Sequence, residues 1–306
     1  MNQLVNCLIY LSLFFIFGQS INAKPYSNSP SEEILRSRIT QKAGVFDLRI
    51  TPEVADYIQS FTIRGRRTTS RIIARSQIYF PIIEQYLKVY NLPDELKYIT
   101  VIESALNPTA QSTVGAMGLW QLMPATARRY GLVINGQIDE RKDPHKSTQA
   151  ALKYLSFLYN LLGDWTLAAA AYNCGGGGVQ KAIRQSGASK FWLLKNDLPQ
   201  QTQHYISRLA GAVYVMNFYH LHNLQPTELD YYMKFTKVAT VHSQLSFEQI
   251  SHAVDIPVSV LKKLNPSYHK AIVPDSTAGN YLILPKMKME QFLTYYNNVI
   301  AKREAD

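Results

Sequence analysis

Cysteine is the scarcest informative residue in this chain, which has 306 residues and only 2 cysteines. Two thiols exclude both a disulfide framework and a zinc site built from several thiolates. Histidine is sparse as well, and none of the 7 histidines forms the HExxH pair of zinc proteases. Acidic residues number 22 against 32 lysines and arginines, which gives a formal net charge of +10. This balance suits an anionic polymer, although charge alone does not choose between nucleic acid and cell wall.

Apolar and aromatic residues, by contrast, are plentiful. Hydrophobic residues make up 46% of the chain, so it can bury a substantial core, and its length fits about two domains. The 20 tyrosines suit grooves for polar polymers, because the ring packs while the hydroxyl forms hydrogen bonds. The sequence contains no nucleic-acid-binding motif and no run of like charges, so we expect no nucleic-acid partner.

The first segment is predicted to be a targeting signal. Residues 4–17 are apolar and uncharged, Ala23 provides a small residue at a cleavage site, and Lys24 is the first charged residue. The run is shorter than the ~20 apolar residues of a full membrane span. Residues 1–23 are therefore interpreted as a cleaved signal peptide, with an uncleaved membrane anchor as the alternative. We expect an exported protein of the periplasm or cell envelope, membrane-associated if the segment is retained.

Helical periodicity then dominates residues 51–225, after a lead-in at 24–50 that we expect to be loose. One helix is predicted to begin at Pro52, and another at Pro93 with acidic residues in its first turn. Strand-like alternation is missing from this block, which predicts an all-α domain. Its expected helices cover 52–61, 79–90, 92–105, 146–162, 166–173, 179–185 and 200–221.

The pattern changes after Pro226. Residues 235–241 and 281–284 are predicted strands, and 246–253 and 257–264 are predicted short helices. We therefore assign a small α+β module to residues 232–286. The tail, residues 287–306, carries one apolar helical face, which we expect to dock on the module.

The candidate chemistry gathers around one glutamate. Leu96, Ile99, Glu103 and Leu106 follow one another at helical steps of three and four, so the carboxylate lies on an apolar face. Two interpretations follow from the spacing alone. Glu103 either pairs with a nearby arginine at the helix end, or its pKa is raised by burial, as a general acid for glycosidic cleavage requires.

Two glycine-containing stretches follow. Residues 115–127 contain Gln121 between Trp120 and Met123, a combination suited to an N-acetyl sugar; the alternative is a tight turn around a buried aromatic. Residues 175–178 are four consecutive glycines, which predict an open loop after a helix. Phosphate binding is discounted, because no Lys-Ser/Thr pair follows the glycines.

Together these segments resemble the catalytic domain of soluble-lytic-transglycosylase-like enzymes, and within that family the membrane-bound lytic murein transglycosylase D type. The resemblance covers roughly residues 50–220. It implies a mainly α, lysozyme-like fold that acts on peptidoglycan strands. It also implies cleavage of the β-1,4 bond between N-acetylmuramic acid and N-acetylglucosamine with a 1,6-anhydro product. The residues that carry it are Glu103-Ser104, Pro108, Ala110, Ser112, the stretch 115–127, Asp139-Glu140-Arg141, Asp143-Pro144 and Ala171-Tyr172-Asn173 with Gly175 and Gly177.

The resemblance implies a role for each matched position. Glu103 is the catalytic acid and then the base, and Ser112 orients it or contacts sugar. Gln121 and Met123 hold an N-acetyl group, while Tyr172 faces the glutamate with a polar neighbour beside it. The implied substrate-binding set is Ser112, Gln121, Met123, Tyr172 and Asn173. Cys174 stands where the family usually has alanine. We expect a monomer that needs no metal and no cofactor.

Only one carboxylate falls within these motifs, whereas glycosidases usually use two. A single acid suffices if the substrate's own N-acetyl group and C6 hydroxyl supply the rest. The other nearby carboxylates are expected to be structural, as helix caps or arginine partners. They are Asp139, Glu140, Asp143 and Asp164.

The C-terminal module resembles a divergent LysM module, a type that binds N-acetylglucosamine chains. Residues 245–250, 260–266 and 282–285 follow the helix–Asn-Pro–strand order, but the usual opening Gly-Asp is replaced by residues 242–244. Glycan binding and a purely structural role both remain open for it. For the whole chain, the alternatives to a transglycosylase are a lysozyme-type hydrolase and a non-catalytic wall-binding protein.

Overall fold

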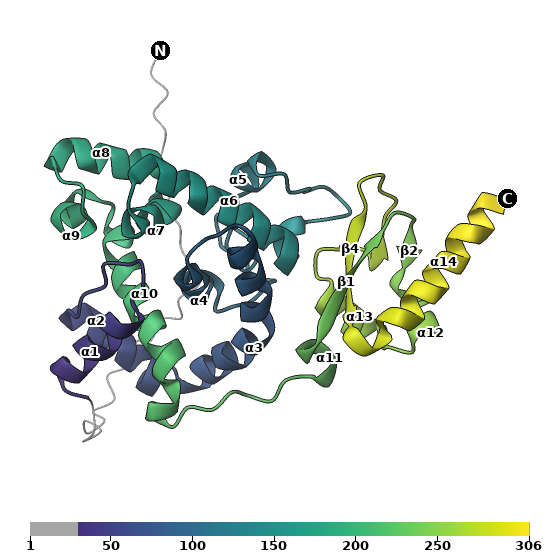
Figure 1. The fold of residues 1–306 in the computed structure, drawn as a ribbon, viewed down its shortest axis with the longest axis horizontal. Helices are drawn as coiled ribbons and strands as arrows, with labels where there is room; N and C mark the ends of the chain where they lie inside the picture. The colour runs from purple at the N-terminus through teal and green to yellow at the C-terminus, as the bar shows by residue number, and fades with distance from the viewer. Residues whose placement is uncertain (1–29, 306) are drawn as a thin grey trace, which may run out of the picture.

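The computed structural model describes residues 30–305, without the side chains of residues 302–305. The predicted signal peptide therefore lies outside the described residues. Within residues 30–305, no helix combines the length and apolarity needed to cross a membrane. Figure 1 shows two parts, a larger helical part and a smaller part of strands and helices, joined by a long segment after α10. Each part has its own cluster of buried hydrophobic residues.

The helical part is mainly α, as expected. Its long helices are α3 (Arg66–Val89), α6 (Pro144–Leu162) and α10 (Gln200–Phe218). The shorter elements are α1 (Glu32–Lys42), α2 (Pro52–Gln59), the π-helical turn η1 (Ser60–Arg64), η2 (Asp94–Tyr98), α4 (Ile99–Ser104), α5 (Pro124–Arg129), η3 (Glu140–Lys142), α7 (Trp165–Cys174), α8 (Gly176–Ser186), α9 (Phe191–Leu194), η4 (Lys195–Asp197) and η5 (Tyr219–His222).

Local chemistry explains where several helices begin. Thr51 caps α2 by accepting from the Val54 N–H, and Pro52 occupies the first turn. Asp143 caps α6 and Asp164 caps α7, each accepting from two backbone N–H groups. These starts agree with the predicted helices at 52, 146 and 166 to within two residues.

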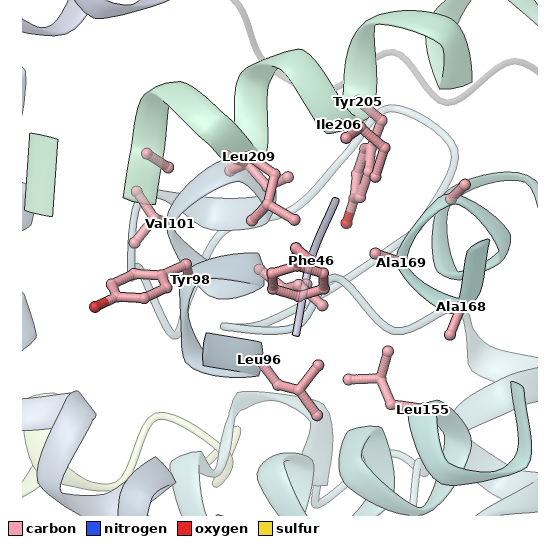
Figure 2. Packing of buried hydrophobic residues seen from close by; sticks show 14 of the residues in the cluster. Phe46, Leu96, Tyr98, Val101, Leu155, Ala168, Ala169, Tyr205, Ile206 and Leu209 are labelled. Carbon is pink, nitrogen blue, oxygen red and sulfur yellow. The ribbon is translucent and has the colours of Figure 1, made fainter. Parts of the chain in front are cut away.

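The core lies where α10 and α7 face α4 and α6. Figure 2 shows Tyr205, Ile206 and Leu209 of α10 on one side of this core, with Phe46 at its centre. Ala168 and Ala169 of α7 are fully buried and let neighbouring helices approach closely. As a result of this packing, α4, the helix that carries Glu103, lies inside the core.

The lead-in differs from the expectation of a loose segment. Ser31 caps a helix, α1, whose Leu35 and Ile39 are buried and belong to the main hydrophobic cluster. Phe46, farther along the lead-in, is only 4% exposed. These apolar residues are buried against the helical part, so the segment 32–48 packs with that part and the boundary at residue 51 is wrong.

The prediction of an open loop at residues 175–178 is also wrong. Gly175 alone takes a left-handed backbone conformation, with φ of +83°, and the next three glycines form the first turn of α8. A Cβ at Gly176 would lie 2.9 Å from Leu161 Cδ2, so glycine allows α8 to pack closely on α6.

The C-terminal module has the predicted strand–helix–helix–strand order. Strands β1 (Thr236–Val241) and β4 (Asn280–Pro285) pair antiparallel, with Thr236 opposite Pro285. The pair β2 (Leu245–Ser246) and β3 (Ile272–Val273) is a second small antiparallel unit that was not predicted. The remaining elements are α11 (Tyr231–Lys234), α12 (Phe247–Val254), α13 (Val258–Leu264), η6 (Lys286–Lys288) and α14 (Met289–Ala305).

Helix α14 docks on this module, as expected. Phe292 is fully buried and Tyr296 is 5% exposed in the module's hydrophobic cluster. The Tyr296 hydroxyl accepts from the His242 N–H at 2.7 Å. Met289, Phe292 and Tyr296 of α14 thus belong to the module's core, which corrects the assignment of residues 287–306 to a separate tail.

Candidate active site

Glu103 lies near the end of α4, two residues before a strained stretch of backbone. Ala105 and Leu106 have φ of +53° and +56°, values that non-glycine residues rarely adopt. The Ala105 carbonyl accepts from Arg75 Nη1 at 3.1 Å, which helps to hold this turn. Two consecutive left-handed residues end the helix abruptly, and such strain clusters at functional sites.

The carboxyl of Glu103 is held by one hydroxyl. Tyr205 Oη donates to Glu103 Oε1 at 2.6 Å. Burial raises the pKa of Glu103 to about 7, while the Tyr205 hydrogen bond and the positive charge of Arg208 act to lower it. The residue still keeps some exposed surface. A carboxyl of this kind can hold a proton near neutral pH and exchange it with a ligand.

Both neighbours of Glu103 come from α10. Tyr205 is 1% exposed, and burial together with the nearby carboxylate raises its pKa well above 10, so it remains a donor. Arg208 Nη2 donates to the Ile102 carbonyl at 2.8 Å, which fixes the guanidinium beside α4. Neither residue was predicted from the sequence. They lie about 100 positions from Glu103, on a helix whose apolar spacing indicated only core.

Ser112 lies in the loop after α4. Its Oγ accepts from the Ala116 N–H at 2.9 Å and closes a turn, and the side chain is buried. The loop is further held by backbone bridges between Gln111 and Met117 and between Met117 and Leu122. Ser112 therefore bonds within its own loop, and the structure shows no hydrogen bond between Ser112 and Glu103.

The side chain of Gln121 also forms hydrogen bonds within this loop. Its Nε2 donates to the carbonyls of Ala110 at 3.0 Å and Gly118 at 2.9 Å, and its φ is +47°. Trp120 beside it is fully buried, with Nε1 donating to Thr148 Oγ1 at 2.9 Å. The tight turn with a buried aromatic is therefore present. Met123 is partly exposed and precedes α5 as its N-cap residue.

Tyr172 and Asn173 come from the end of α7. The Tyr172 hydroxyl donates to the Trp120 carbonyl at 2.7 Å, and its proximity contributes to the raised pKa of Tyr205. Asn173 Oδ1 accepts from Thr202 Oγ1 at 2.9 Å, which ties α7 to α10. Tyr172 thus lies near Tyr205, the residue that bonds Glu103, while Asn173 fixes the end of α7 against α10.

The other nearby carboxylates have structural partners, as predicted. Asp139 pairs with Arg141, and Asp143 and Asp164 cap helices. Glu140 accepts from the Val133 N–H at 2.7 Å and pairs with Lys146 at 3.2 Å. Burial raises the pKa of Asp143 to about 6. None of these four has a bond to Glu103 among the described residues.

Two further observations concern cavities and metal ligands among the described residues. A cavity of about 580 Å³ lies between α1, α2 and η5, and none of the predicted site residues lines it. Within residues 30–305 no three His, Cys, Asp or Glu side chains are grouped so that they could hold a metal ion.

Two models of known protein families match segments of this chain. A family model described as transglycosylase SLT domain matches residues 80–195, which include Glu103 and all five predicted substrate-binding residues. A second, described as the LysM-like domain of lytic transglycosylase MltD, matches residues 235–299. The chain carries an SLT domain followed by an MltD-type LysM-like domain. The second match runs into α14 and so supports including that helix in the LysM-like domain.

Individual relatives agree with the domain assignment. Membrane-bound lytic murein transglycosylase D of Escherichia coli K12 is 32% identical over 240 residues, which cover 75% of this chain and 51% of that protein. Soluble lytic murein transglycosylase of the same strain is 35% identical over 89 residues, 28% of this chain and 14% of that protein. The chain spans about half the length of the first relative.

Among solved structures, the 70-kDa soluble lytic transglycosylase of E. coli aligns with a TM-score of 0.42 and 20% identity. That alignment covers 62% of this chain and 43% of the solved chain.

Proposed function

We propose that this protein is a peptidoglycan lytic transglycosylase. It cleaves the β-1,4 bond between N-acetylmuramic acid and N-acetylglucosamine and leaves 1,6-anhydromuramic acid ends. The observation that carries the proposal is Glu103, which lies within the segment that matches the SLT domain model. Burial raises its pKa to about 7, and Tyr205 of the following helix α10 donates a hydrogen bond to its carboxyl. The murein named in the relatives' descriptions supports the substrate class.

The Glu103–Tyr205 geometry fits an acid that becomes a base. Tyr205 donates to Oε1, so Oε2 carries the proton that passes to the leaving glycosidic oxygen. The C–O bond to the leaving sugar breaks, and the C6 hydroxyl of the muramic acid attacks the anomeric carbon. Glu103, now a carboxylate, takes the C6 hydroxyl proton, which closes the anhydro ring and restores the acid. Tyr205 and the charge of Arg208 favour the carboxylate during the intermediate stage.

The single carboxylate favours this route over hydrolysis by two carboxylates. Asp139, Glu140, Asp143 and Asp164 are each committed to a cap or an ion pair in the structure. The second chemical role then falls to the substrate, through its N-acetyl group and C6 hydroxyl. A lysozyme-type hydrolase, which uses water instead, is the alternative that the products distinguish.

We assign the sugar contacts to the segments around Glu103. Gln121 uses its amide nitrogen within the loop, and its carbonyl oxygen is the atom we assign to an N-acetyl N–H. Met123 supplies an apolar contact for the acetyl methyl. Ser112, Tyr172 and Asn173 shape and support this surface through the bonds described above. We place the protein in the periplasm or cell envelope as a monomer on peptidoglycan strands, without a nucleic-acid partner, metal or cofactor.

Replacing Glu103 with glutamine tests the proposal. Glu103→Gln keeps the shape and can still accept from Tyr205, but it removes the proton donor, so turnover of purified peptidoglycan should fall by orders of magnitude. The matched control is Glu95→Gln in η2, eight residues earlier, which should retain turnover. Substantial cleavage by pure Glu103→Gln would remove Glu103 as the acid and would require another group to donate the proton.

A further inference from the structure

We infer that the LysM-like domain positions the substrate loop of the SLT domain, through Ile138 and the buried Asp139–Arg141 pair. The loop is the segment 115–123, which contains Gln121 and Met123. The inference about turnover rests on the proposed function, whereas the inference about the loop does not. It gives the LysM-like domain a task beyond any glycan binding of its own.

Ile138 belongs to the SLT domain by sequence and to the LysM-like domain by packing. It is 5% exposed, and its contacts place it in the hydrophobic cluster of the LysM-like domain. Its backbone forms an antiparallel bridge with Tyr268. The flanking hydrogen bonds run from Asp139 N to the Ser267 carbonyl and from His269 N to the Gln137 carbonyl, both at 2.9 Å.

The residue that follows this anchor begins a rigid connection. Asp139 accepts from Arg141 Nε at 2.9 Å and from Arg141 Nη2 at 2.7 Å, a bidentate pair. Both side chains are 7% exposed. A buried, two-point ion pair allows little independent motion of its partners, since separating them would leave an uncompensated charge.

Arg141 also forms hydrogen bonds with the substrate loop. Its Nη1 donates to the Gly115 carbonyl at 2.7 Å and to the Leu122 carbonyl at 3.2 Å, so one guanidinium joins the two ends of the segment. Gly118, between them, lies so close that a Cβ there would be 1.8 Å from the Arg141 carbonyl oxygen. A displacement of Arg141 therefore shifts the loop that presents Gln121.

A second contact keeps the two domains from sliding past each other. Lys146 Nζ lies 4.6 Å from the centre of the Tyr281 ring, and His145 meets the same ring edge-on. Tyr281 is on β4, and Lys146 and His145 are in the first turn of α6, just after the Asp139–Arg141 pair. The anchor at Ile138 and this contact together fix the orientation of the connection.

Full-chain variants can measure the coupling. Ile138→Ser removes the apolar anchor. Arg141→Lys removes the bidentate pair with Asp139 and the hydrogen bonds to the two loop carbonyls. Ile138→Val is the conservative rescue. Leu293→Ser is the matched control, because Leu293 is 42% exposed on α14, whose C-terminal end points away from the helical part (Figure 1). The readouts are hydrogen exchange of the 115–123 amides, and KM and kcat on soluble glycan fragments.

We expect Ile138→Ser to speed exchange of the 115–123 amides at least tenfold and to raise KM several-fold, with kcat within about twofold. Arg141→Lys should do the same, and the double variant should be no worse than the poorer single variant, because both changes break one connection. Ile138→Val and Leu293→Ser should match the unmodified chain.

Unchanged exchange in Ile138→Ser would overturn the inference, as would effects of the two single variants that multiply in KM. A chain without any glycan cleavage would contradict the proposed function alone. The exchange measurement would still decide the coupling in that case.

Discussion

At Glu103, burial and hydrogen bonding act on one carboxyl in opposite directions. Burial is the larger effect and raises the pKa to about 7, while Tyr205 and Arg208 limit the rise. The balance leaves both protonation states accessible near neutral pH. An acid that must become a base within one cycle needs this balance more than it needs a strong acid.

The raised pKa has a cost in stability, which Glu103→Gln should reveal. Between about pH 4.5 and pH 7 the folded chain binds the proton more tightly than the unfolded chain, so folding stability falls as pH rises through this window. Glutamine does not titrate. Glu103→Gln should therefore be more stable than the unmodified protein at pH 8, by on the order of 1–3 kcal/mol, since the exposed part of the residue limits the effect.

Thermal or denaturant unfolding at pH 4 and at pH 8 measures this difference. The advantage of Glu103→Gln should shrink at pH 4, where the glutamate is protonated in both states. An advantage that is equal at both pH values would show that burial of the charge is not its cause.

Tyr205→Phe should change the pH profile as well as the rate. The Tyr205 hydrogen bond lowers the pKa of Glu103, so its loss should raise that pKa and move the alkaline limb of kcat/KM to higher pH. The rate should fall by about 10–100-fold, because hydrogen bonds to charged groups are worth about 1.5–3 kcal/mol. A lower rate with an unmoved alkaline limb would show that Tyr205 acts only through packing.

Among the elements, the loop of residues 107–123 depends most on individual backbone conformations. Gly118 has φ of +85° and faces the Arg141 carbonyl, whereas Gly115 has φ of +89° with no heavy atom within 4 Å of a would-be Cβ. Both positions have a positive φ that favours glycine, but only Gly118 also lies against the backbone of another segment, at Arg141. The two positions therefore separate backbone strain from steric clash.

Gly118→Ala should destabilise the protein by several kcal/mol more than Gly115→Ala, because a Cβ 1.8 Å from a buried carbonyl oxygen cannot be accommodated without moving η3. Denaturant unfolding of the two variants measures the difference. Equal losses would show that the positive φ alone accounts for the cost and that the loop can move away from Arg141.

The elements also show what the sequence could predict. The helix start at Pro52 was predicted, and that of α6 was predicted at residue 146, within two residues of its observed start at Pro144. Caps and prolines act within a few residues, so such starts can be read from the sequence. Tyr205 was not, because its contact with Glu103 joins positions about 100 residues apart and its place on an apolar helix face resembles ordinary core. The four glycines misled for a related reason. The local sequence did not show that α8 begins at Gly176 or that this first turn packs against Leu161 of α6.

At the scale of the whole molecule, two hydrophobic clusters form two domains that share a connection. The sequence indicated both domains and the order of their elements, because each has its own local periodicity. It did not indicate that Ile138 packs in the second cluster or that α1 packs in the first. Such contacts depend on which surfaces remain uncovered after the helices form.

The proposed mechanism uses one buried carboxyl and the C6 hydroxyl of the substrate, and no water. The muropeptides that the full chain releases from purified peptidoglycan can be weighed by mass spectrometry, with Glu103→Gln as the blank. We expect ends that are mainly 1,6-anhydromuramic acid, each lighter by one water than a lysozyme product, and almost none from Glu103→Gln. Mainly reducing muramic acid ends would exclude this mechanism and make the protein a hydrolase.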